Sequence, residues 1–347
     1  MDMHAMGGGL EAGNATMTMH TECDGSLDIS RKGSWQGHIL PGSVFVMWGA
    51  WWAYNVCLAV LKANHSRPYA AQPWFRMGLK RFYWMEPLLK IILPPLAVSV
   101  ELYFDHTAFR YLYCPEGTQY AGRYAVTHMN NWQHTSIYPA FLVSGVTDVL
   151  CLLGVPLPPG TGQSVLALAF GVMSFIMGSH RKHEPLDAAV HLLLFYSMLL
   201  VTAALLAELA RPSSPALGLA RAWAAVFLGA WLCEVGVIEF DGLPQWSADY
   251  AGSAMFAPVV WAMIGLLVAS ALLALFASLA ALQRRGLLPA PPPRVAGSGA
   301  DGDCPWQGLD PKVEPRQASM GPDAGAGQTY TPVSDGQRWP AAFHLDV

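Results

Sequence analysis

Residues 252–282, GSAMFAPVVWAMIGLLVASALLALFASLAAL, contain no charged side chain. A helix needs about 20 apolar residues to cross the hydrocarbon core of a bilayer, so this stretch is long enough to span a membrane and to tilt or extend beyond its core. Hydrocarbon offers no hydrogen-bond partners, and a single spanning segment satisfies its backbone groups only as a helix. The stretch therefore predicts a transmembrane helix.

Six further stretches of this kind precede it. The chain of 347 residues is 53% hydrophobic and 13% charged, whereas an average soluble domain has about 25% charged residues. The predicted spans are Ile39–Leu61, Pro87–Phe104, Trp132–Leu153, Gln163–Gly178, Leu186–Leu209, Ala222–Phe240 and Gly252–Leu282. We therefore expect an all-α, polytopic membrane protein, with a seven-helix bundle at residues 37–284 in a lipid bilayer.

The two ends of the chain differ from this bundle in composition. Residues 1–36 hold the motifs MDMHAM and MTMHTEC and lack the apolar segment of a cleavable signal peptide. Residues 285–347 are rich in Pro, Gly and Ser and cannot bury a core. We expect both tails to be disordered. The last residues, Leu345-Asp346-Val347, have the spacing of a peptide that adds to the sheet edge of a protein partner.

The Met and His residues of the N-terminal tail suggest a metal. Thioether and thiol groups favour Cu(I), and imidazole can join them. The tail resembles the Met/His-rich outer tails of copper transporters of the Ctr type. A low-complexity segment that is rich in Met by chance would look the same.

Charge and cysteine content exclude other classes of protein. The net charge is −4, and no run of Lys and Arg is typical of a nucleic-acid surface. Six cysteines are scattered without a CxxC pair, which predicts neither a disulfide framework nor a zinc ribbon. Lys and Arg are slightly more frequent in the loops that share a face with the C-terminal tail. This bias favours an N-terminus that is outside or lumenal and a cytosolic C-terminus.

Most His and acidic residues of the spans share one membrane face. Spans one, three and five begin, and spans two, four and six end, at the face where the chain enters span one; we call it the N-terminal face. The chemistry-bearing residues near it include His38, Glu101, Asn131, Gln133, His134, His183, Asp187, His191 and Glu234. The more deeply placed ionisable groups lie roughly 3–12 Å below the surface. Because lipid contact would cost a few kcal/mol there, we expect them to face a polar vestibule.

Imidazole and carboxylate groups together suit zinc or another first-row metal such as copper. The predicted metal ligands are His134, His191, Asp187, Glu101 and Glu234, and the predicted polar cluster around them is His38, Asn131, Gln133 and His183. An interhelical hydrogen-bond network would use the same side chains without a metal. The opposite face has Glu86, Asp148 and Glu208 but no matching histidines. We expect Trp48, Trp51 and Trp52 in an interfacial aromatic belt.

Several motifs resemble the transmembrane protein 45 family over about residues 36–283. They are GHILPGS at residues 37–43, NWQHTSIY at 131–138, VSGVTDVL at 143–150, PLDAAVHLLL at 185–194 and GLPQW at 242–246. The matching positions are Gly37, His38, Pro41, Gly42, Asn131, Trp132, Gln133, His134, Asp148, Pro185, Leu186, Asp187 and His191, and glutamates recur at Glu86, Glu101 and Glu208. The chain departs from the family at Ala189 and Ala262, where relatives often have His. The resemblance implies seven membrane helices, a cytosolic C-terminal tail and no established activity.

The leading interpretation is a non-enzymatic membrane protein whose vestibule binds a metal ion or a small polar ligand. No catalytic residue is predicted. One alternative is a zinc-dependent intramembrane hydrolase like the seven-helix ceramidase and progestin-receptor-like proteins, although those carry a His pair on the last helix that is absent here. Another is a scaffold or trafficking protein that acts through its C-terminal tail.

Overall fold

The computed structural model describes residues 22–26, 34–63, 68–76, 84–104, 111–180, 184–248 and 250–288. Most of the two predicted tails lies outside these ranges. Residues 22–26 are the exception in the N-terminal tail, and they form a turn closed by a hydrogen bond from the Gly25 backbone N–H to the Glu22 carbonyl oxygen, at 2.9 Å.

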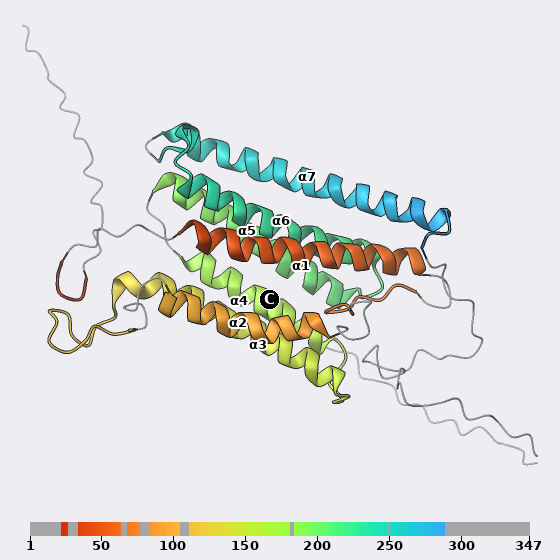
Figure 1. Cartoon of the computed structure of the whole chain (residues 1–347), viewed down its shortest axis with the longest axis horizontal. Helices are drawn as coiled ribbons and strands as arrows, with labels where there is room; N and C mark the ends of the chain where they lie inside the picture. The colour runs from red at the N-terminus through yellow and green to blue at the C-terminus, as the bar shows by residue number, and fades with distance from the viewer. Residues whose placement is uncertain are drawn as a thin grey trace, which may run out of the picture. The chain divides into compact units, whose positions relative to one another are not determined.

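The described part of the chain is all-α, as predicted. Its α-helices are α1 (Trp35–Lys62), α2 (Met85–Ser99), α3 (Met129–Leu152), α4 (Thr161–Ser179), α5 (Pro185–Ala210), α6 (Pro215–Phe240) and α7 (Ala251–Arg284) (Figure 1). A π-helical turn at Val100–Phe104 extends α2, and short 3-10 turns at Val126–His128 and Pro244–Trp246 precede α3 and α7. Of these helices, six are long and apolar enough to cross a membrane, and α2 is the shorter exception.

Local sequence sets the helix ends. The Ser34 hydroxyl accepts a hydrogen bond from the Gly37 N–H at 3.1 Å and caps α1. Helices α5 and α6 begin with Pro185 and Pro215, at the position where a missing N–H has no cost. Helix α6 therefore starts seven residues before the predicted span at Ala222, which brings Arg221 inside the helix.

Helix α1 packs against α6 more closely than against any other described helix, and glycines make this contact possible. A Cβ atom on Gly49 would lie 2.5 Å from the Val226 nitrogen, and one on Gly42 would lie 2.6 Å from the Cys233 sulfur. No side chain fits at such distances, so the two backbones approach each other directly. Each helix from α2 to α5 also packs against the helix that follows it in the sequence. Helix α7 packs against α5, α6 and α1.

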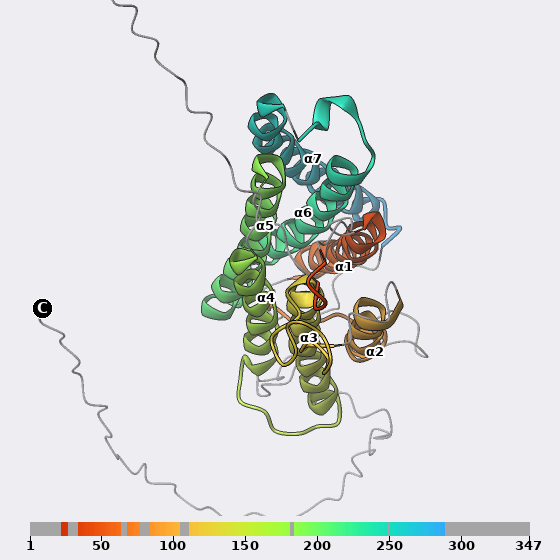
Figure 2. The ribbon, with the colours of Figure 1, turned by 90° about the vertical axis from the view of Figure 1, so that its left-hand side faces the viewer.

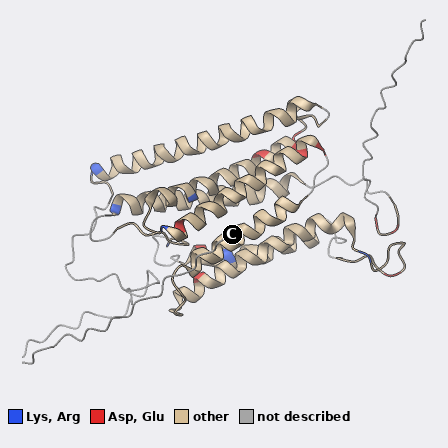
Figure 3. Ribbon diagram, turned by 180° about the vertical axis from the view of Figure 1, so that it is seen from behind, with Lys and Arg blue, Asp and Glu red and all other residues tan. Residues whose placement is uncertain are grey.

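This arrangement places α1 and α6 in the middle of the bundle, with α7 on one side and α2 and α3 on the other (Figures 1 and 2). The core contains fully buried aromatic side chains, among them Trp52, Phe170 and Trp231. Among the coloured positions of the helices, Lys, Arg, Asp and Glu gather toward the two ends of the bundle (Figure 3).

Candidate functional site

Four histidines form a row across the N-terminal face. His134 of α3, His180 at the end of α4, His191 of α5 and His38 of α1 follow one another. The centres of successive rings are 5.6, 5.9 and 6.1 Å apart in that order. We call these four side chains the histidine row. It joins four helices that are far apart in the sequence.

Each ring of the histidine row has an oxygen atom facing its Nδ1. The hydrogen bonds are His180 with Gln133 Oε1 at 2.6 Å, His191 with the Asp187 carbonyl oxygen at 2.9 Å, and His38 with the Ser34 carbonyl oxygen at 3.0 Å. The ion-pair contacts are His134 with Glu101 Oε1 at 3.6 Å and His191 with Asp187 Oδ1 at 2.7 Å. A neutral imidazole that donates from Nδ1 carries its lone pair on Nε2. Histidines that bind metal ions almost always donate their other ring N–H in this manner.

Glu101 contacts His134, which is at one end of the histidine row. It belongs to the π-helical turn after α2. Its carboxylate accepts hydrogen bonds from the Tyr138 hydroxyl at 3.1 Å and from Asn131 Nδ2 at 3.3 Å. Asn131, His134 and Tyr138 are spaced by three and four residues and therefore project from one side of α3. The His134 side chain is 36% exposed and the His191 side chain 11%, so the row is more open at His134 than at His191.

The structure thus brings together most of the residues that the sequence predicted at this face. It does not bring Glu234 to the row, since within the described ranges Glu234 has no hydrogen bond or ion pair with the four histidines. His183 lies outside the described residues. His180 was not among the predicted site residues, yet it lies between His134 and His191. The sequence signal that could have identified His180 is its position just after predicted span four, at the N-terminal face.

Metal binding by the predicted ligands is not supported by the geometry of the side chains as they stand. Among the described residues, no group of three or more His, Cys, Asp and Glu side chains is arranged to hold one metal ion. A hydrolytic zinc site needs about three protein ligands and a water molecule. The hydrolase alternative remains a prediction with no support among the described side chains.

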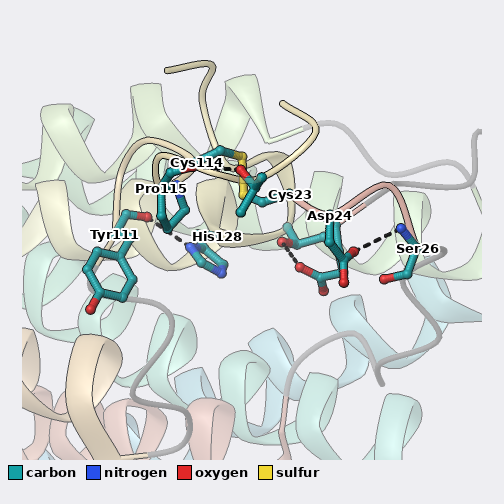
Figure 4. Close-up of a disulfide and its surroundings, with 10 residues drawn as sticks. Cys23, Asp24, Ser26, Tyr111, Cys114, Pro115 and His128 are labelled. Carbon is teal, nitrogen blue, oxygen red and sulfur yellow. Dashed lines mark hydrogen bonds between the residues drawn. A yellow bond between two sulfur atoms is a disulfide. The ribbon is translucent and has the colours of Figure 1, made fainter. Parts of the chain in front are cut away.

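The sequence predicted no disulfide framework, and the described residues contain one long-range disulfide that it did not foresee. Cys23 and Cys114 are bonded, and they are 91 residues apart in the sequence (Figure 4). The Tyr120 N–H donates to the Cys23 carbonyl oxygen at 3.1 Å, and the Thr127 hydroxyl donates to Glu22 at 3.2 Å. The turn at residues 22–26 is therefore attached to the loop before α3. A search for closely spaced pairs could not find this bond, because only the fold brings the two cysteines together.

The same turn carries an acidic group outside the membrane. Asp24 accepts a hydrogen bond from the Ser26 N–H at 2.9 Å (Figure 4). Hydrogen bonds from the Ser26 side chain and backbone lower the pKa of the Asp24 carboxyl. Asp24 is consequently ionised at neutral pH and adds negative charge to this face.

A second polar group near the opposite face centres on Glu86 of α2. Its carboxylate accepts from Trp48 Nε1 and Trp52 Nε1 at 2.8 Å each, from Trp51 Nε1 at 3.1 Å, and from the Phe75 N–H at 2.9 Å. All four partners are N–H donors, so both oxygens of the Glu86 side chain accept hydrogen bonds. The three tryptophans that were predicted in an interfacial belt lie on one side of α1 and donate to this buried carboxylate.

Two ion pairs accompany Glu86. Lys90 Nζ is 2.7 Å from Asp148 Oδ2, and Arg221 Nη1 is 3.2 Å from Glu208 Oε2. Arg221 also donates to the Gln72 carbonyl oxygen at 2.7 Å and lies over the Trp52 ring at 4.5 Å. All these charged side chains are buried. We call Glu86, Lys90, Asp148, Glu208 and Arg221 the opposite-face cluster.

Sequence reasoning identified only the acidic half of the opposite-face cluster. Arg221 directly precedes the predicted start of span six at Ala222, so it was placed outside the membrane. Lys90 lay inside a predicted span without an assigned partner. Near-complete burial and internal pairing indicate that this cluster holds helices together, whereas His134 of the histidine row is partly exposed.

One comparison with known proteins bears on these residues. Residues 159–245 match a family described as "Family of unknown function (DUF716)", which is the transmembrane protein 45 family. The matched segment contains α4, α5 and α6 and hence His180, Asp187 and His191 of the N-terminal face. The match confirms the family resemblance over this segment and assigns no activity. Together with the apolar helices, it identifies an integral, multi-pass membrane protein.

The ion pair between Lys90 and Asp148 leads to a prediction about stability. Lys90→Met leaves a buried carboxylate without its cation and should lower the free energy of unfolding by about 3–5 kcal/mol. Lys90→Met combined with Asp148→Leu removes both charges and should recover most of that loss. Unfolding of the purified variants in detergent measures both effects. If the double variant is as unstable as the sum of the two single variants, the pair does not act as described.

Proposed function

We propose that the histidine row binds a first-row divalent metal ion, with zinc as the reference ion, and that the protein is a non-enzymatic metal-binding membrane protein. The observation that carries the proposal is the spacing of the rings. Two imidazoles that share a tetrahedral zinc ion have centres roughly 5–6 Å apart, given Zn–N bonds of about 2.0–2.1 Å. The successive separations of 5.6 and 5.9 Å around His180 fall in this range.

The chemistry of the row favours some metals over others. Imidazole suits Zn, Cu and Ni, whereas Mg and Ca prefer oxygen ligands. Neighbouring carboxylates from Glu101 and Asp187 face Nδ1 of His134 and His191, and such partners raise the basicity of a ligating imidazole. We therefore infer that adjacent imidazoles supply nitrogen ligands and that the two carboxylates orient the rings. Water completes the coordination at the exposed end.

Metal analysis of the purified full-length protein tests this proposal. After treatment with a chelator and dialysis against zinc, the wild type should retain about one ion per chain. His180→Ala with His191→Ala should lose the ion, because every adjacent pair of rings is broken. Glu101→Gln should weaken zinc affinity by roughly 10- to 100-fold, as is typical when the partner of a ligating histidine is removed.

His128→Ala is the matched control, since His128 lies at the same face and its Nδ1 contacts the Tyr111 carbonyl oxygen at 2.8 Å, outside the row. This variant should keep its zinc. A wild type that retains no metal would refute the proposal. Equal zinc content in the wild type and the double variant would show that the ion binds elsewhere.

We further propose that the N-terminal face is extracellular or lumenal and that the C-terminus is cytosolic. Disulfide bonds persist in oxidising compartments and are rare in the cytosol. The bond between Cys23 and Cys114 lies in the segments that precede α1 and α3, at the face of the histidine row. Cys151, at the C-terminal end of α3 near the opposite face, is also disulfide-bonded, so the disulfides alone do not decide the orientation. The distribution of Lys and Arg in the loops favours the same orientation. The row would then meet metal ions from outside the cytosol.

Two exposed loop positions distinguish the orientations. In sealed membranes of known sidedness, a membrane-impermeant maleimide should label Glu116→Cys, in the loop before α3, from the extracytosolic side. Ser213→Cys, in the loop between α5 and α6, should react only after permeabilisation. The reverse pattern of labelling would place the N-terminus in the cytosol.

A further inference from the structure

A cleft of about 420 Å³ lies between α1, α6 and α7. Every side chain that lines it is aliphatic. The side of the cleft formed by α1 and α6 contains small residues, notably Ala50 and Ala53 of α1 and Ala230 of α6. An ordered water molecule needs several polar partners, so this cleft is unsuited to water. In a bilayer, the medium that surrounds these helices and can fill the space is hydrocarbon.

The walls of the cleft are held in place and cannot simply collapse. On one side of the cleft, α1 and α6 are in the close contact that Gly42 and Gly49 permit. Helix α7 is attached at one end of the cleft by a hydrogen bond from Trp223 Nε1 to the Gly265 carbonyl oxygen, at 2.9 Å. Beyond the other end, Gln283 Nε2 donates to the Leu61 carbonyl oxygen at 3.0 Å. The lining residues of α7 lie largely between these two attachments.

Basic side chains lie beyond one end of the cleft. The bond between Gln283 and Leu61 brings the ends of α7 and α1 together, and Lys62, Arg284 and Arg285 are the adjacent residues. Figure 3 shows Lys and Arg at these two helix ends. None of the three has a salt bridge to an acidic residue in the described part of the chain. They are therefore available to an anionic partner from outside the protein.

The distance between the basic group and the cleft matches one leaflet of a membrane. Leu275, which lines the cleft, is nine residues before Arg284, or about 14 Å along the helix. One leaflet contributes about half of a hydrocarbon core that is about 30 Å thick. The α7 lining continues from Leu275 to Ile264, about 30 Å from Arg284. A lipid with its phosphate at the basic group would therefore place the end of its acyl chain in the part of the cleft nearest to that group.

We propose that this side of the bundle binds an anionic phospholipid, with its phosphate at Lys62, Arg284 and Arg285 and one acyl chain in the cleft. Arginine side chains bind phosphate oxygens through paired N–H donors, so Arg284 and Arg285 suit a phosphate headgroup. This site is separate from the histidine row and lies near the opposite membrane face. If that face is cytosolic, its leaflet supplies anionic lipids.

Native mass spectrometry of the full-length protein in micelles that contain equal amounts of phosphatidylglycerol and phosphatidylcholine tests the proposal. The wild type should retain one phosphatidylglycerol molecule in preference to phosphatidylcholine. Arg284→Gln with Arg285→Gln should reduce this preference by about 20-fold, because each basic side chain near an anionic headgroup contributes roughly a factor of five.

Two variants test the acyl-chain cleft independently. Ala271→Phe and Ala50→Phe add an aromatic ring at exposed positions in the cleft and should each abolish the retained lipid. Ala277→Phe is the control, since Ala277 is also exposed on α7 but does not line the cleft. It should retain the lipid as the wild type does. Equal retention of phosphatidylglycerol by the three Phe variants would overturn the proposal. So would a wild type that shows no preference for phosphatidylglycerol.

Discussion

An ionisable side chain within the hydrocarbon of a bilayer must find its partners inside the protein. Exposure to lipid at the centre of a helix costs about 2.5–3.5 kcal/mol per charged group on insertion scales. This constraint explains where the polar residues of the bundle lie. Near the opposite face, Glu86, Lys90 and Arg221 are buried and each has charged or N–H partners. The same requirement determines which sides of α1, α2 and α6 turn inward.

The two polar groups satisfy this constraint in different ways. The opposite-face cluster contains two ion pairs and Glu86, whose carboxylate accepts only N–H donors, and its members are buried. The histidine row contains imidazoles, which can be neutral and therefore tolerate a partly apolar site more readily. The His134 side chain is also partly exposed. These differences support the proposed binding role of the histidine row and a structural role for the opposite-face cluster.

The fold and much of the N-terminal face were predictable from the sequence because helix parity depends only on the number of spans. Parity placed His38, His134 and His191 at one face, and their burial between helices followed from the cost of lipid contact. The partners on the opposite side were less predictable. A search for apolar spans excludes charges such as Arg221, since it cannot know that Glu208 neutralises them. The bond between Cys23 and Cys114 likewise depends on how the segments before α1 and α3 pack.

The central claim is that adjacent imidazoles of the histidine row ligate a metal ion. X-ray absorption at the zinc edge of the zinc-loaded, full-length protein measures the ligands directly. The account predicts nitrogen or oxygen neighbours at about 2.0–2.1 Å, together with the outer-shell scattering of at least two imidazole rings. A spectrum with sulfur neighbours, or with oxygen neighbours and no imidazole scattering, would contradict it.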